Sequence, residues 1–147
     1  MMITVGRFTT SENRVDSATW VDTPLASVVT LPWPPDVTRR TRTEWSRRDS
    51  VVIARNEGLP VSVEGYFVGA KQEGPEATNC HGAESRFRDW HLWLSANPGK
   101  NRRRSIVVET TPAVRATHAE WSLNDIHKLV RDSVYVRVSA VTFGSGD

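Results

Sequence analysis

Alternation of apolar and polar residues from Leu59 to Gly69 constrains the fold of this chain more than any other feature. A period of two is typical of a β-strand. One side carries Val61, Val63, Gly65, Phe67 and Gly69, and the other carries Ser62, Glu64, Tyr66 and Val68. One apolar and one mixed face are expected when only one side of a sheet covers a core. The two glycines predict a bend in this strand.

Three later segments show the same alternation and are also predicted to be strands. In residues 89–94, Trp90, Leu92 and Leu94 share one face. Residues 105–110 and 134–141 follow the same rule, with apolar side chains at every second position. A mainly β fold is therefore expected.

One helix is predicted between the third and fourth of these strands, at Ser122–Arg131. Its apolar residues recur at three-and-four spacing, which is typical of a helix with one buried face. Ser122 can accept a hydrogen bond from an amide in the first turn, with Asp125 as its capping-box partner. The apolar positions are Leu123, Ile126, Leu129 and Val130.

The order of three strands, one helix and a further strand predicts an OB-like fold, a five-stranded Greek-key barrel. The fifth strand is missing from this series. Either an N-terminal segment, Ile3–Phe8 or Val51–Ala54, completes the barrel, or an unpaired edge remains open to a partner. The predicted domain covers residues 50–143, and residues 144–147 are expected to be a flexible tail.

Residues 1–49 are expected to form an extended, weakly ordered arm. They contain four prolines between Pro24 and Pro35, and proline disfavours helix interiors and central strands. Five arginines lie between Arg39 and Arg48, around Trp45. This basic stretch is either a solvated linker or a nucleic-acid-binding arm.

The whole-chain properties exclude several classes of protein. A length of 147 residues fits one domain, and a formal charge of +2 favours no class of partner. Cys80 is the only cysteine, which excludes an intrachain disulfide and favours a reducing compartment. The N-terminus lacks the pattern of a secretory signal, and no apolar run is long enough to span a bilayer. We therefore expect a soluble, cytoplasmic protein without a membrane partner.

Several short motifs resemble a family of uncharacterised bacterial proteins with small OB-like domains. The family pattern combines a GPE-x-x-NC turn, a D-x-H strand and a VVE-x-TP segment. Its counterparts here are Gly74-Pro75-Glu76 with Asn79-Cys80, Asp89 with His91, and Val107-Val108-Glu109 with Thr111-Pro112. The resemblance implies the OB-like fold and names no activity. Family members continue into a Trp-bearing final strand, which has no counterpart in this sequence.

A metal site is the first chemical hypothesis. Cys80, His81, Asp89 and His91 are possible zinc ligands, because zinc accepts sulfur, imidazole and carboxylate donors. The alternative is a buried cysteine and a structural His91 that donates to Glu64 or Glu109 on a neighbouring strand. We expect no cofactor, with zinc as the possible exception.

A metal-dependent, nuclease-like hydrolase is the second hypothesis. Asp89, Glu109 and Arg115 supply the carboxylates and the cation that phosphodiester cleavage requires. Only composition supports this interpretation, so a protein without enzymatic activity is favoured.

Binding of single-stranded DNA or RNA is the third hypothesis and the preferred one. OB-folds hold single strands with cationic grooves and stacked aromatic side chains. The candidate residues are Arg86, Arg88, Trp93, Arg102, Arg103 and Arg104. The alternatives are a tryptophan packed in the core beside a solvated basic turn, and a protein-interaction or self-associating subunit that uses the open sheet edge.

Overall fold

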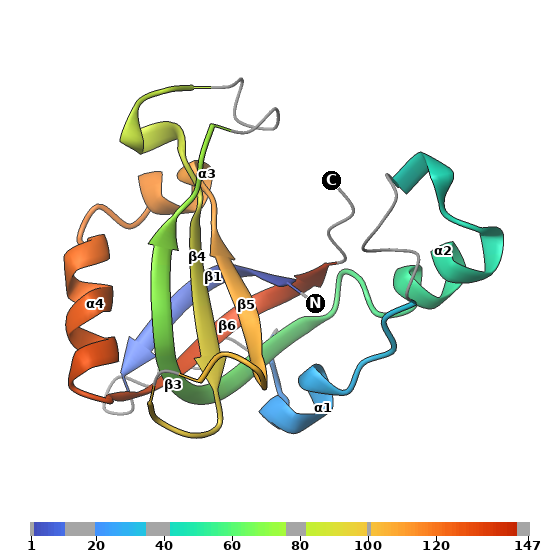
Figure 1. Ribbon diagram of the computed structural model, residues 1–147, viewed down its shortest axis with the longest axis horizontal. Helices are drawn as coiled ribbons and strands as arrows, with labels where there is room; N and C mark the ends of the chain where they lie inside the picture. The colour runs from blue at the N-terminus through green and yellow to red at the C-terminus, as the bar shows by residue number, and fades with distance from the viewer. Residues whose placement is uncertain (1, 11–19, 35–41, 76–81, 100, 144–147) are drawn as a thin grey trace.

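The computed structural model describes residues 2–10, 20–34, 42–75, 82–99 and 101–143, and its strands form one sheet flanked by short helices (Figure 1). The tail 144–147 lies outside the described residues. The elements in chain order are β1 (Met2–Thr10), β2 (Val21–Asp22), α1 (Leu25–Val29), the 3-10 helix η2 (Arg42–Glu44), α2 (Arg47–Ala54), β3 (Pro60–Gln72), the 3-10 helix η4 (Ser85–Phe87), β4 (Trp90–Ser95), β5 (Ser105–Thr110), α3 (Pro112–Ala116), α4 (Leu123–Arg131) and β6 (Tyr135–Phe143).

The sheet is mixed and consists mainly of five long strands. The strand order is β2-β3-β4-β5-β1-β6, and β6 also pairs with β3. β1 runs parallel to β5 and antiparallel to β6, and the short β2 runs parallel to β3. In Figure 1, β3, β4 and β5 lie in front, and β1 and β6 cross behind them. The prediction of a mainly β fold is therefore confirmed.

Strand β3 bends because it changes partners along its length. Residues 60–66 pair with β6, and residues 66–72 pair with β4. The register shifts between Phe67 and Gly69, and such a bulge bends a strand. At Gly65 the backbones are so close that a Cβ would lie 2.6 Å from the carbonyl oxygen of Ser95. Gly65 thus allows β3 and β4 to approach at the position where the partner changes.

The predicted apolar faces form the core. Every second residue of β4, β5 and β6 is buried, and so are Val61, Val63, Gly65 and Phe67 of β3, as the sequence predicted. The prediction is wrong for Gly69, because the bulge after Phe67 places it opposite Trp93 on the other face. The fully or nearly fully buried side chains include Val63, Phe67, Leu92, Leu94, Ile106, Val108, Val136 and Val138. The core therefore lies on one side of each strand, and the alternate residues remain on the opposite face.

Helix α4 covers β3 and follows the sequence prediction closely. Ile126 is buried, and its apolar neighbours Leu123, Leu129 and Val130 pack against the core. Ser122 caps the helix: its hydroxyl accepts a hydrogen bond from the Asp125 amide at 3.1 Å. The prediction of a helix between the third and fourth strands is confirmed, although α1, α2 and α3 are additional.

The described residues among the first forty-nine, 2–10, 20–34 and 42–49, differ from the predicted extended arm. Strand β1 pairs with both β5 and β6, and Leu25 and Val28 of α1 belong to the core. A boundary at residue 50 is therefore wrong, because this region contributes to the sheet. Of the two candidate N-terminal segments, Ile3–Phe8 lies in β1, whereas Val51–Ala54 lies in helix α2. Four apolar residues are too few to distinguish a strand from a helix by periodicity.

Helix α2 also has a start signal that the strand interpretation overlooked. The hydroxyl of Ser46 accepts a hydrogen bond from the Asp49 amide at 3.1 Å, which caps the first turn. Within the described residues, no helix has the length and apolar character needed to cross a bilayer.

Candidate nucleic-acid interface

Trp93 lies on the face of β4 opposite the core. Its neighbours Leu92 and Leu94 point inward and are fully buried, so Trp93 points outward, where it is half-buried. The residue opposite on β3 is Gly69, which has no side chain to cover the indole ring. The guanidinium of Arg102 occupies this space, because a Cβ on Gly69 would lie 2.7 Å from the Arg102 Nε atom. Strand pairing and a glycine therefore create the room for an Arg–Trp contact.

The guanidinium of Arg102 stacks over the indole of Trp93. Its central carbon lies 3.8 Å from the ring centroid, within the range of a cation–π interaction. Arg102 comes from the β4–β5 connection and not from a strand, so the turn itself brings the cation to the sheet face. We call the set of Trp93, Arg102, Arg103 and Arg104 the Trp93 platform.

The turn that carries these arginines is held by its own polar groups. The Arg102 carbonyl accepts hydrogen bonds from the amide and the hydroxyl of Ser105, at 3.2 and 2.7 Å. The side-chain oxygen of Asn101 accepts a bond from the Arg103 amide at 3.0 Å. All three arginine side chains are exposed, and none forms an ion pair with a described residue. The sequence from 95 to 108 contains no Asp or Glu, so the turn remains cationic.

Arg86 and Arg88 lie at the other end of β4, around η4, and do not join the Trp93 platform. Arg86 forms an exposed ion pair with Glu84 at 2.9 Å and stacks over Phe87. Arg88 is half-buried and donates to the Ala83 carbonyl at 2.7 Å. The structure therefore separates the six predicted nucleic-acid-binding residues into a group of four and a group of two. In the other basic stretch, residues 39–41 lie outside the described residues.

The four predicted metal ligands do not form a described site. Cys80 and His81 lie outside the described residues. Asp89 is buried, and the His91 Nδ1 atom lies 2.9 Å from Glu73 Oε1. Among the described residues there is no group of three or more His, Cys, Asp or Glu side chains placed to hold a metal ion.

His91 has a carboxylate partner, as the structural alternative proposed, but the partner is Glu73 and not Glu64 or Glu109. Glu73 follows the end of β3, where its amide donates to the Asp89 carbonyl at 2.8 Å. Burial lowers the pKa of His91, and the charges of Glu73 and Asp89 oppose this effect. The ring therefore belongs to a local polar cluster at one end of β4.

The residues of the hydrolase hypothesis, Asp89, Glu109 and Arg115, make contacts that stabilise one end of the sheet. Arg115 donates to the carbonyls of Thr110 and Arg88, at 2.5 and 2.6 Å, and its guanidinium stacks on Trp90. Burial lowers the pKa of Arg115, and the charge of Asp89 opposes this effect. Asp89 and Glu109 are both buried and have further polar partners. This group ties η4 and α3 to the end of the sheet.

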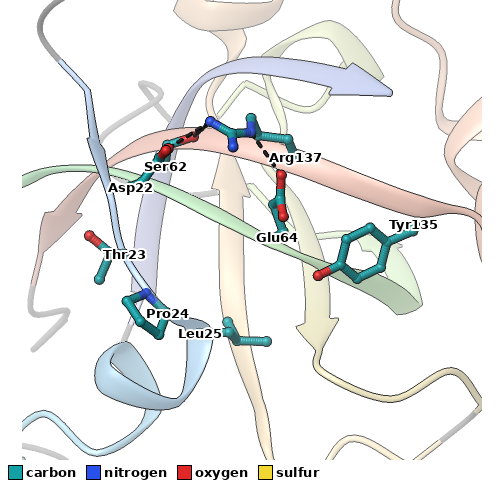
Figure 2. Close-up of a pocket in the computed structure, with 8 residues that line it drawn as sticks. All are labelled: Asp22, Thr23, Pro24, Leu25, Ser62, Glu64, Tyr135 and Arg137. Atoms are coloured by element: carbon teal, nitrogen blue, oxygen red, sulfur yellow. Dashed lines mark hydrogen bonds and ion pairs between the residues drawn. The ribbon is translucent and has the colours of Figure 1, made fainter. Parts of the chain in front are cut away.

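A second feature of the outer face is a cavity that the sequence did not predict (Figure 2). It measures about 310 Å³. Figure 2 shows the guanidinium of Arg137 reaching Asp22 on one side and Glu64 on the other. The cavity is lined by Asp22, Thr23, Pro24, Leu25, Ser62, Glu64, Tyr135 and Arg137.

Comparisons with protein families, with curated proteins and with solved structures find no match to this chain. The resemblance to a bacterial family therefore stays a prediction, and any function has to be argued from the geometry of the site.

Proposed function

We propose that this protein binds single-stranded nucleic acid at the Trp93 platform. The observation that carries the proposal is the 3.8 Å stack of Arg102 on Trp93, on an outer sheet face and beside two further exposed arginines. Single strands are bound by cationic grooves with aromatic rings on which bases stack. The platform combines both chemistries within one turn and one strand.

We propose further that the sheet is OB-like, with β1 in the place of the missing fifth strand. Three features support this proposal. β1 runs parallel to β5, β6 pairs with the bent strand β3, and α4 lies between β5 and β6. On this assignment β4 and β5 correspond to the second and third strands, the strands whose face carries the ligand in OB-folds. The Trp93 platform lies on that face and on the turn that joins these strands.

The stacking geometry suggests how a strand would bind. A base can stack on the exposed guanidinium of Arg102, or it can displace this side chain and stack on the indole directly. Arg103 and Arg104 would then neutralise the flanking phosphates, because no acidic residue of the turn competes for them. Sequence preference is not expected from these contacts alone, since every base has a π-face.

The direct experiment measures binding of a fluorescently labelled ten-nucleotide oligothymidylate by anisotropy at several salt concentrations. The triple substitution of Arg102, Arg103 and Arg104 by Ala should weaken binding and lower the salt slope by about 1.4, because Arg103 and Arg104 each lose a phosphate contact worth roughly 0.7. The matched control replaces Arg55, Lys128 and Arg131 by Ala, an equal change of charge on exposed positions elsewhere. Absence of binding at low salt, or equal losses in the two variants, would overturn the proposal.

A further inference from the structure

The Arg137 cavity lies on the same outer face as the Trp93 platform. Tyr66 is opposite Tyr135 on β6 and also opposite Ser95 on β4, and the two tyrosine rings meet edge to face at 4.9 Å. Ser95 and Trp93 are two residues apart on one side of β4, about 7 Å along the strand. The tyrosines therefore bridge the cavity and the platform, at a spacing suited to successive nucleotides of an extended strand.

Arg137 has two carboxylate partners in the cavity. Its Nε donates to Glu64 Oε1 at 3.0 Å, and its Nη1 donates to Asp22 Oδ1 at 2.6 Å. Burial opposes the charge of Arg137, but the hydrogen bond to Glu64 and the charge of Asp22 more than compensate and raise its pKa. The side chain of Arg137 is 18% exposed. The two carboxylates thus orient the guanidinium at the cavity wall.

Several hydrogen-bonding groups of the cavity are not used within the described part of the chain. The Nη2 of Arg137 donates no bond there, and the second oxygen of Glu64 accepts none. The Tyr135 ring is exposed at the cavity wall. With two carboxylates and one guanidinium, the formal charge of the group is −1, which disfavours a phosphate. The complementary ligand presents N–H donors next to an acceptor, on a flat ring.

We infer that this cavity binds a guanine base of the single strand, an inference that rests on the proposed function. Among the bases only guanine places two neighbouring donors, N1–H and the N2 amino group, beside an acceptor, O6. Glu64 would accept both donors, since a carboxylate can accept two parallel bonds. The Arg137 Nη2 would donate to O6, and the exposed Tyr135 ring would stack on the base. The phosphates stay at the cationic Trp93 platform.

The test compares labelled oligothymidylates that differ only at one central position, which carries T, G, A, C or hypoxanthine. Binding of the guanine strand should be roughly tenfold tighter than binding of the thymine strand. The hypoxanthine strand should lose most of this gain, because the base lacks the N2 amino group. Glu64→Gln should abolish the preference for guanine while thymine-strand binding persists. The control Glu84→Gln changes an exposed carboxylate at the other end of β4 and should leave the preference intact.

Equal affinities for all strands, or a preference that survives Glu64→Gln, would overturn the guanine site while leaving the Trp93 platform standing. If no strand binds at low salt, the proposed function fails, and the cavity is then tested alone. Guanosine and inosine are titrated while the Tyr135 ring signals are followed by NMR. Shifts that appear at lower concentrations of guanosine than of inosine would support the site, whereas equal shifts with both nucleosides, or no shifts, would overturn it.

Discussion

Strand β4 carries two Arg–Trp stacks, one at the core and one on the outer face, and they differ in what else the arginine contacts. On the core side, Trp90 is 8% exposed and is covered by Arg115, which also donates to backbone carbonyls. On the outer side, Trp93 is covered by Arg102, whose guanidinium donates to no described residue.

The difference distinguishes an arginine that holds the fold together, Arg115, from one that is available to a ligand, Arg102. A cation whose donors are satisfied by carbonyls fixes neighbouring segments and has little left for a ligand. The guanidinium of Arg102 donates to none of the residues that the structure describes, so a phosphate or a base can bind it without breaking a described hydrogen bond. On the proposed function, the same pair of residue types has a structural role at Trp90 and a binding role at Trp93, and substitutions at the two sites test this contrast.

The largest contrast is expected between the two tryptophans. Trp90→Ala should lower the free energy of unfolding by about 3–5 kcal/mol, because it removes a buried ring and leaves a cavity. Trp93→Ala should cost roughly half as much or less, since this ring is half-buried. Urea unfolding measures both losses of free energy, provided that the dependence of the unfolding free energy on urea concentration is the same in all variants. Equal losses would contradict the assignment of Trp93 to the outer face.

The two arginines should show the same contrast, with smaller changes in the free energy of unfolding. Arg115→Ala leaves the carbonyls of Thr110 and Arg88 without their donor and should cost about 1.5–3 kcal/mol. Arg102→Ala should change stability by less than about 0.5 kcal/mol, as is usual for exposed positions. Thermal unfolding of the two variants checks this. A strongly destabilised Arg102 variant would show that its stack is structural.

Two glycines of β3 give a third contrast. Gly65→Ala should destabilise by about 1–3 kcal/mol, because the added Cβ meets the Ser95 carbonyl, a backbone atom that cannot move alone. For Gly69→Ala, the atoms nearest to the added Cβ belong to the flexible end of Arg102, so the substitution should cost less. Combining Gly69→Ala with Arg102→Ala should remove even that cost. If the cost of Gly69→Ala persists in the double variant, the contact of Gly69 with Arg102 is not its cause.

The smallest expected effect is the contribution of His91 to the pH dependence of folding stability. Because burial lowers its pKa below the ordinary 6.5, the unfolded chain binds more protons than the folded chain between the two pKa values. His91 therefore favours folding above pH 6.5, and this contribution is lost as the pH falls through the folded-state pKa. The unfolding midpoint should drop less on acidification in His91→Gln than in the unsubstituted protein. If the unfolding midpoints of the two proteins fall in parallel as the pH is lowered, His91 is not responsible for the loss of stability.

The sequence predicted local structure well and long-range contacts poorly. Alternation located β3, β4, β5 and β6, and the Ser122 cap located α4, because these signals lie within a few residues. The contact of Asp22 with Arg137 joins positions 115 residues apart and depends on how β2 and β6 flank β3. No local pattern encodes that register. The same limit hid the Arg137 cavity and left Ile3–Phe8 as one of two candidates for the missing strand, whereas Trp93 and the basic turn could be predicted because strand parity and composition are local.

If Trp93 on the outer face of β4 binds single strands by stacking, as proposed, then removal of its π-face should weaken binding. The affinity for the labelled oligothymidylate is compared between the unsubstituted protein and Trp93→Leu, which keeps apolar bulk but removes the π-face. We expect a loss of about 1–3 kcal/mol, the contribution of one stacked base. An unchanged affinity in a folded Trp93→Leu variant would contradict the account.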